Sequence, residues 1–410
     1  MKQKKVVLAS GSRHTIPAIS SSPGNARTIT AFAEKETDKL NYYVLSKYDV
    51  SLESINFNRS KYLHPLPSAT NAIYEYILNK LPYRVKKRIF GFTQADRIIY
   101  YYGIKKIISK VQPDIIVTFM HFELYHILQK AFPKVKHIFF YLSTDIKGRL
   151  GENKIKYILE NSDGFMANTE LAIKEFKEFN KLDSLPTASV YNAVMLPKDS
   201  YNNSEEKIKH DFKVKFKIEN NALILGYAGR FSNEKSLLEI LEAMLLLKND
   251  GEIVHLYVAG DINNERTPDF EYYNKVISFI EKHLKEQVHF FGWVSYEELF
   301  NFYAAIDVGI LLSKYREGNS MFLIECLSVG KPVIATNVGG NIETLHNNEI
   351  GYLIDKNTVV QSLFEKLKYL DMNRATLNKL SKNASIYAKE HHSNEVMTKS
   401  FNNFIERFIE

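Results

Sequence analysis

Residues 223–250 read LILGYAGRFSNEKSLLEILEAMLLLKND, which is a short apolar run, a polar loop and a longer periodic stretch. The run 223–228 is typical of a strand that is covered on both faces, as in a parallel sheet. From 236 to 250 the apolar residues follow the helical period. One face of this helix carries Leu237, Ile240, Leu241, Met244 and Leu245. A buried strand that leads directly into an amphipathic helix is the repeating unit of an α/β fold.

The same unit recurs in both halves of the chain. The apolar runs are KKVVLAS, NYYVLS, DIIVTFM, HIFFYLS, GFMANT and ASVYNAV in the first half, and LILGYAG, VHLYVAG, VHFFGWV, DVGILLS and PVIATNV in the second. Helical stretches between them fit right-handed parallel crossovers. The polar, turn-rich stretch 196–212 separates the two sets. We therefore expect Rossmann-like domains at 1–200 and 201–376, and a helical segment at 377–410.

Composition narrows the class of protein. The chain has 410 residues, of which 45% are hydrophobic and 25% charged, and this excludes disordered, collagenous and coiled-coil classes. Its single cysteine, Cys326, excludes an internal disulfide framework and favours a reducing compartment. We find no signal peptide and no apolar run near the roughly 20 residues that span a bilayer. A cytoplasmic location is expected.

The net charge of +7 is concentrated in one window. Residues 71–110 hold nine basic and two acidic residues, which accounts for the whole excess. At the centre of the window, residues 81–92 read LPYRVKKRIFGF and interleave cations with Tyr83, Ile89 and Phe92. This pattern suits an anionic membrane surface, and the alternative is an ordinary solvated helix face. Nucleic acid is not expected as a partner, since no recognised binding module is present.

The loop 229–235, GRFSNEK, is the first candidate for a binding site. Gly229 permits close approach of a ligand to the backbone, and Ser232 or Asn233 can cap the following helix. Two cations, Arg230 and Lys235, then stand beside free amides, which suits a diphosphate. The alternative is a pair of surface cations.

The stretch 317–327, EGNSMFLIECL, is the second candidate. Asn319 or Ser320 can cap a helix whose first amides are open to a ligand beside Gly318. Glu325 lies inside that helix among apolar neighbours, where a carboxylate needs a partner. A ribose diol and an Arg or Lys of the same chain are both open as that partner.

Two further loops are weaker binding candidates. Trp293 and Val294 end a strand and could meet a base, although packing is the alternative. The glycine-rich loop 336–343 enters another helix, although it can be a simple turn. The adjacent histidines His391 and His392 are expected to lie at the surface. No metal and no resident cofactor are expected, because there is no Asp-x-Asp pair, no Gly-x4-Gly-Lys loop and no His-Glu-x2-His helix.

Four motifs occur in a fixed order in the second half. They are GR-x4-K from Gly229 to Lys235, E-x7-E from Glu317 to Glu325, GKPVIAT at 330–336 and VGG-x2-E at 338–343. As a set they resemble glycosyltransferase family 4, whose members are retaining enzymes with the GT-B fold. The resemblance covers about residues 223–353 closely. It implies two domains that face each other across a cleft. The second domain would mainly hold the sugar donor, and the first would mainly hold the acceptor. The last helix of the chain would cross back to the first domain.

The resemblance also implies roles for residues. Arg230 and Lys235 would hold the diphosphate, Glu317 the donor sugar and Glu325 the ribose, and we take Arg230, Lys235 and Glu317 as the catalytic set. The co-substrate would be a nucleotide-diphosphate sugar. The remaining donor-binding candidates are Gly229, Gly318, Asn319, Ser320, Met321, Phe322, Trp293 and Val294.

The first domain departs from the family pattern. The first loop, SSSPGNART at 20–28, has only Gly24 where relatives carry a Gly-Gly pair, and Thr144-Asp145 stand where a His-Asp pair is usual. His121, at the end of the neighbouring apolar run, is a candidate replacement for that histidine. Gly24, His121, Thr144 and Asp145 are therefore the candidate contacts to the sugar or acceptor.

The sequence thus predicts a retaining glycosyltransferase. The expected acceptor is a glycan or a lipid-linked molecule of bacterial surface polysaccharide or glycolipid synthesis, met at the inner face of the membrane. The alternatives are a GT-B sugar-nucleotide epimerase or phosphorylase, and a non-catalytic protein that binds anionic partners.

Overall fold

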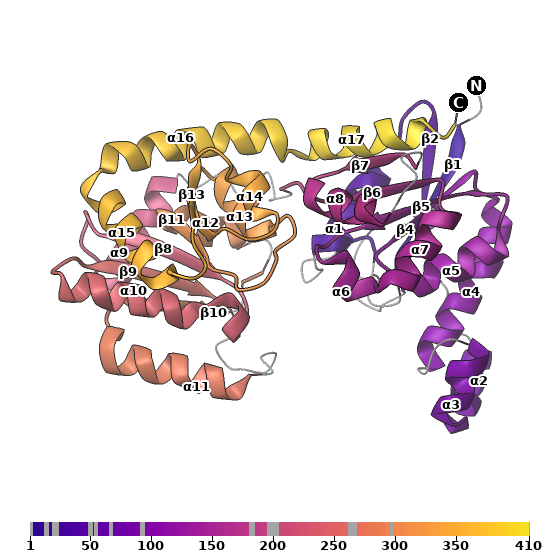
Figure 1. Ribbon diagram of the computed structural model, residues 1–410, viewed down its shortest axis with the longest axis horizontal. Coiled ribbons are helices and arrows are strands. Elements are labelled where there is room, and N and C mark those ends of the chain that lie inside the picture. The colour runs from indigo at the N-terminus through magenta and orange to yellow at the C-terminus, as the bar shows by residue number, and fades with distance from the viewer. Residues whose placement is uncertain are drawn as a thin grey trace. The chain divides into compact units, whose positions relative to one another are not determined.

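The computed structural model describes residues 3–11, 16–18, 24–47, 52, 56–64, 69–90, 95–179, 185–194, 205–260, 269–292, 294–295 and 298–409. The chain divides into two compact units (Figure 1). The first contains Met1–Val190 and Met397–Glu410, and the second contains Tyr191–Val396. Each unit has its own parallel sheet. None of the described helices is both long and apolar enough to cross a membrane.

The first unit is built on a seven-stranded sheet of order β3-β2-β1-β4-β5-β6-β7, in which every pair is parallel. The strands are β1 (Lys4–Ala9), β2 (Leu40–Leu45), β3 (Tyr62–Leu63), β4 (Ile115–Phe119), β5 (Lys136–Tyr141), β6 (Gly164–Ala167) and β7 (Thr187–Ser189). The helices are α1 (Gly24–Glu34), α2 (Ala69–Lys80), α3 (Tyr83–Phe90), α4 (Ala95–Val111), α5 (Phe122–Ala131), α6 (Ile146–Leu150), α7 (Glu152–Asn161), α8 (Glu170–Glu178) and α17 (Asn394–Glu406).

The second unit has a six-stranded parallel sheet of order β10-β9-β8-β11-β12-β13. The strands are β8 (Leu223–Ala228), β9 (Val254–Ala259), β10 (Val288–Gly292), β11 (Val308–Leu311), β12 (Val333–Thr336) and β13 (Gly351–Ile354). The helices are α9 (Glu205–Phe216), η3 (Asn233–Lys235), α10 (Leu237–Asn249), α11 (Phe270–Phe279), η4 (Ile280–Leu284), α12 (Leu299–Ala305), α13 (Met321–Ser328), α14 (Asn341–Thr344), α15 (Val359–Met372) and α16 (Arg374–His391).

All eleven apolar runs of the sequence contain strands of these two sheets, so the predicted α/β fold is confirmed. The strands β3 and β13 were not predicted. Both are short and lie at sheet edges, where little continuous burial is needed. Helix α10 buries Leu237, Ile240, Leu241 and Met244 as expected, whereas Leu245 is only partly buried.

Strand order decides where a ligand can meet each sheet. In the first unit β1 lies between β2 and β4, and in the second β8 lies between β9 and β11. The loops that follow two such neighbouring strands run to opposite faces of the sheet, which leaves a crevice at their carboxyl ends. The loops after β8 and β11 are the two stretches that the sequence marked as binding candidates.

The C-terminal segment 377–410 is divided between the units. Helix α16 packs against α13 in the second unit. In the first unit, the ring of Phe401 on α17 stacks on Phe32, with centroids 3.9 Å apart, and the hydroxyl of Tyr42 donates to Asn402 Oδ1 at 2.6 Å. The segment therefore does not pack as one piece on the first unit. The expected boundary near residue 200 lies outside the described residues.

The expectation that His391 and His392 form a surface pair is wrong for His392. His391 is exposed, but His392 is buried, and its Nδ1 lies 3.0 Å from the carbonyl oxygen of Asn192. Burial lowers the pKa of His392 to about 4. The helical period places the two residues on different faces of the end of α16, and no local pattern indicates that the chain near Asn192 covers one of them.

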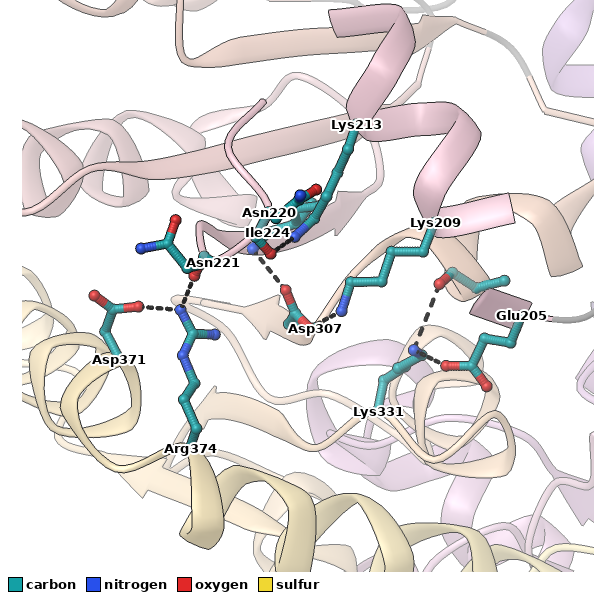
Figure 2. A network of polar contacts seen from close by, with 11 residues as sticks. Glu205, Lys209, Lys213, Asn220, Asn221, Ile224, Asp307, Lys331, Asp371 and Arg374 are labelled. Atoms are coloured by element: carbon teal, nitrogen blue, oxygen red, sulfur yellow. Dashed lines mark hydrogen bonds and ion pairs between the residues drawn. The ribbon is translucent and has the colours of Figure 1, made fainter. Parts of the chain in front are cut away.

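Charged side chains fasten α9 to the amino end of the second sheet (Figure 2). The carboxylate of Asp307 forms an ion pair with Lys209 and accepts from the backbone N–H of Ile224 at 2.9 Å. The buried Lys331 pairs with Glu205 at the start of the same helix. These contacts lie at the opposite edge of the sheet from the carboxyl ends of the strands, so they hold the unit together away from the candidate site.

Candidate nucleotide-sugar site

The loop after β8 has a different form from the one expected. Ser232 precedes the 3-10 turn η3 without a side-chain cap hydrogen bond, and α10 begins only after Ser236, whose φ is +52°. Lys235 therefore ends η3 and does not lie in the first turn of the long helix. The start of this loop lies close to the end of β9, because a Cβ on Gly260 would lie 2.6 Å from the carbonyl oxygen of Gly229.

Lys235 and Glu317 meet, although they are 82 residues apart in the chain. The Lys235 ammonium forms an ion pair with the Glu317 carboxylate, which also accepts a hydrogen bond from the Ser313 hydroxyl. The ammonium lies 5.2 Å from the ring centroid of Tyr315. The side chains of Lys235 and Glu317 are only 18% and 11% exposed. The adjacency of β8 and β11 places these groups together at the carboxyl ends of the two strands.

The carboxylate of Glu317 keeps the side chain of Lys235 protonated. Burial by itself lowers the pKa of Lys235, but the charge of Glu317 and the hydrogen bond to it outweigh that effect, and the pKa lies above its usual value. Glu317 compensates this charge, and an anion that enters the site can interact strongly with the ammonium because little water screens it. The ammonium is thus a fixed positive charge at the switch point of the sheet.

The backbone of Glu317 is held by the glycine-rich loop 336–343. The N–H of Gly340 donates to the carbonyl oxygen of Glu317 at 2.8 Å. Gly339 has a φ of +54°, and a Cβ on it would lie 2.2 Å from the same oxygen. This loop was open to interpretation as a simple turn, but the structure gives it a definite task, which is to support Glu317.

Arg230 pairs with a different carboxylate from Lys235. Its side chain is 58% exposed and lies 3.7 Å from the carboxylate of Glu234. Lys314, a cation that the sequence did not single out, forms an ion pair with Glu239 and donates to Asn233 Oδ1 at 2.5 Å. Lys314 thus ties the loop after β11 to η3.

The start of α13 presents open amides, as expected, but without the expected cap. Ser320 takes the N-cap position and makes no side-chain cap hydrogen bond. Asn319 is buried, and its Oδ1 accepts from the backbone N–H of Asn192 at 2.7 Å. Because the first N–H groups of a helix have no partner inside it, those of Met321 and Phe322 can receive an anion. Gly318 lies before Asn319 and the N-cap residue Ser320.

Glu325 is buried inside α13, and the hydroxyl of Tyr303 donates to its Oε2 at 2.6 Å. Burial and the neighbouring Glu325 raise the pKa of the Tyr303 hydroxyl well above its usual range, so it stays a donor. Tyr303 was not among the partners that the sequence suggested for this carboxylate. Val294 packs against the core of the unit, and Trp293 lies outside the described residues.

In the first unit, His121 lies between β4 and α5, and the loop after β1 contacts it. A Cβ on Gly11 would lie 2.0 Å from the His121 Nε2, so the ring rests on that glycine at the switch point of the sheet. Sequence reasoning missed Gly11 and chose Gly24, which begins α1. The sequence signal for Gly11 was its position just after the first apolar run, where a loop leaves the carboxyl end of a strand.

Thr144 and Asp145 follow β5 in the same sheet. Thr144 is buried, whereas Asp145 is exposed. Asp145 has a φ of +58°, and its Oδ1 accepts from the N–H of Gly148 at 3.1 Å, which caps α6. Its carboxylate therefore already has a structural task.

Comparisons with known proteins identify relatives of this chain. The model of the family Glycosyl transferases group 1 matches residues 208–387. A lipopolysaccharide 1,2-N-acetylglucosaminetransferase of Salmonella typhimurium is 26% identical over 301 residues, which cover 72% of this chain and 73% of that protein. The capsular polysaccharide biosynthesis glycosyltransferase CapM of Staphylococcus aureus is 23% identical over 62% of this chain and 66% of its own length.

Solved structures resemble the whole chain. Sucrose-phosphate synthase of Thermosynechococcus elongatus has a TM-score of 0.74 at 17% identity and covers 99% of both chains. HepE of Anabaena, solved with UDP, has a TM-score of 0.73 at 15% identity and covers 98% of this chain and all of its own. These likenesses establish the fold as that of GT-B glycosyltransferases. The family match over residues 208–387 lies within the second unit, and together with the two relatives it supports a glycosyltransferase.

Proposed function

We propose that this protein transfers a sugar from a nucleoside-diphosphate donor to an acceptor with retention of the anomeric configuration. The observation that carries the proposal is the buried Lys235–Glu317 pair at the carboxyl ends of β8 and β11, in the loops that lead to α10 and α13. The cation and amides suit a diphosphate, and carboxylates such as Glu317 suit sugar hydroxyls. HepE has been solved with UDP-glucose, which supports a donor of this class.

The chemistry follows from charge. Cleavage of the anomeric C–O bond places negative charge on the leaving diphosphate. Lys235 and the first amides of α13 stabilise that charge more in the transition state than in the ground state. Arg230 assists from the exposed rim of the loop. Glu325, held by Tyr303, orients the ribose.

Retention is proposed to follow from attack on the face of the sugar that the diphosphate leaves. The acceptor oxygen forms the new bond to the anomeric carbon while the C–O bond to phosphate breaks. The departing phosphate oxygen takes the acceptor proton. His121, resting on Gly11, is the candidate contact to the transferred sugar or the acceptor.

The acceptor is proposed to be a glycan or a lipid-linked molecule of a bacterial surface polysaccharide or lipopolysaccharide. The two relatives from Salmonella typhimurium and Staphylococcus aureus are named for such products, which supports the proposal. A cytoplasmic protein that reaches a lipid-linked acceptor works at the inner membrane face, and residues 81–92 are the proposed contact with that surface.

The test is release of nucleoside diphosphate from a panel of UDP-, GDP-, ADP- and TDP-sugars, with and without a bacterial lipid extract as acceptor source. Transfer predicts release with one donor that increases when the extract is added, and a product with the donor's anomeric configuration by NMR. Lys235→Met should abolish it, while Lys275→Met, which removes an exposed lysine paired with Glu271, should not. Conversion of the donor to an epimer without an acceptor would favour the epimerase alternative.

A further inference from the structure

The first unit exposes an apolar stripe on a helix that also neighbours a cluster of cations. On α2, the side chains of Ile73, Tyr76 and Ile77 are 60%, 62% and 50% exposed. Their spacing with Lys80 is i, i+3, i+4 and i+7, so the four lie on one face of the helix. Leu78, on another face, is buried against the core of the unit. The apolar stripe of α2 therefore points to solvent.

The next two helices also expose large apolar side chains. Figure 1 shows α2 and α3 well away from the strands of the first unit, and α2 contacts α4. We call the exposed side chains of these helices the α2–α4 surface. Its large members are Ile73, Tyr74, Tyr76, Ile77, Tyr83, Ile89 and Tyr102. An exposed apolar patch of this kind marks an interaction site. Phe92, which the sequence included in this region, lies outside the described residues.

Cations accompany the aromatic rings on each of these helices. Lys80 lies 4.4 Å from the ring centroid of Tyr76, and Lys105 lies 4.8 Å from that of Tyr102. Lys87 and Tyr83 form a third such pair on α3, at 5.9 Å. A ring beside an ammonium combines an apolar body with a charged tip, which suits the boundary between lipid chains and headgroups.

The charge of the surface is strongly one-sided. Residues 69–90 contain Lys80, Arg84, Lys86, Lys87 and Arg88 against a single acid, Glu75. Among the described residues, no ion pair involves these five cations, in contrast with Lys275 and Lys285, which pair with Glu271 and Glu281. Unpaired cations around exposed aliphatic side chains match an anionic bilayer. A nucleic acid would satisfy the cations but would leave the isoleucines in water.

We infer that the α2–α4 surface is a membrane-docking surface that binds anionic lipid bilayers, with the α2 stripe inserted among the lipid chains. This deepens the proposed function, on which it rests for its biological purpose, because it names the surface that brings the enzyme to a lipid-linked acceptor. Binding to vesicles needs neither donor nor acceptor, so the two proposals can fail separately.

The experiment is cosedimentation of the full chain with vesicles of phosphatidylcholine, alone or mixed with phosphatidylglycerol, at low and high salt. Wild type should bind only the mixed vesicles, and salt should weaken binding by screening. Each surface cation contributes a factor of about five, so Lys86→Gln with Lys87→Gln should weaken binding roughly 25-fold. Ile73→Ser with Ile77→Ser should weaken it at least as much, because it removes the inserted side chains.

Matched controls keep the result specific. Lys379→Gln with Lys382→Gln on α16 and Ile253→Ser, all exposed positions of the second unit, should leave vesicle binding unchanged. The inference would be overturned if wild type bound neither kind of vesicle, or bound only the vesicles without phosphatidylglycerol. It would also be overturned if the control variants lost as much vesicle binding as the surface variants, or if the protein bound single-stranded RNA but no vesicles. Nucleoside-diphosphate binding by the same samples reports separately on the proposed function.

Discussion

Replacement of Glu317 by glutamine removes one half of the buried ion pair and leaves Lys235 charged. Loss of one partner of a buried pair costs roughly 3–5 kcal/mol, since the remaining charge has no compensation. The amide oxygen of the introduced glutamine can still accept from Ser313, so we expect the lower end, about 3 kcal/mol of unfolding free energy. The pKa of Lys235 should fall toward the value that burial favours, because the Glu317 carboxylate no longer raises it.

A diphosphate should reverse much of this loss. Its negative charge takes the place of the missing carboxylate beside Lys235, so the stability gap between Glu317→Gln and wild type should narrow by at least about 1 kcal/mol when nucleoside diphosphate is saturating. The assay is urea unfolding followed by circular dichroism, with and without nucleotide. The control is Glu271→Gln, which breaks the exposed pair with Lys275 and should change stability by less than about 1 kcal/mol.

A loss of less than about 1 kcal/mol of unfolding free energy in Glu317→Gln would contradict this expectation, because Lys235 and Glu317 would then not depend on each other as a buried pair. A gap that stays the same when nucleotide is added would show that the diphosphate does not meet Lys235. The double variant with Lys235→Met should be more stable than Glu317→Gln alone, because it leaves no unpaired charge.

Three further outcomes are expected. Gly339→Ala should lower the free energy of unfolding by more than about 2 kcal/mol, because the added Cβ meets the Glu317 carbonyl oxygen and the φ of residue 339 is positive. It should also weaken nucleotide binding. Urea unfolding checks the first effect and calorimetry the second. His392 is neutral in the folded state with a pKa of about 4, whereas the unfolded chain takes up the proton near pH 6.5, so stability should fall by about 2 kcal/mol between pH 7 and pH 5, with a shallower fall in His392→Gln. Asp307→Asn should cost about 3 kcal/mol in urea unfolding, since it leaves Lys209 without its largely buried carboxylate partner, and an unchanged midpoint would contradict the role given to it in fastening α9.

Local sequence patterns predicted the fold because both sheets are parallel. Strands covered on two faces are continuous apolar runs, and such runs stand out without knowledge of their neighbours. The edge strands β3 and β13 lack that signal. The exposure of His392 was also predicted wrongly because no local signal marks its burial. That burial depends on the segment near Asn192, which is distant in sequence.

The sequence singled out individual residues of the candidate site, but it did not indicate which of them contact one another. Lys235 and Glu317 were each singled out, yet their pairing depends on the adjacency of β8 and β11, and strand order leaves no periodic trace in a sequence. The support of Glu317 by Gly339 is likewise a contact between segments. Gly11 was overlooked because the family pattern drew attention to Gly24, whereas the space beside His121 is what requires a glycine.

The most direct test of the diphosphate site is calorimetric titration of UDP, GDP, ADP and TDP into wild type, Lys235→Met and Lys275→Met. We expect one nucleotide to bind to wild type and to Lys275→Met with the same affinity, and Lys235→Met to lose most of that affinity because its buried cation is gone. Equal binding of the same nucleotide by Lys235→Met and wild type would contradict the placement of the diphosphate at the carboxyl ends of β8 and β11.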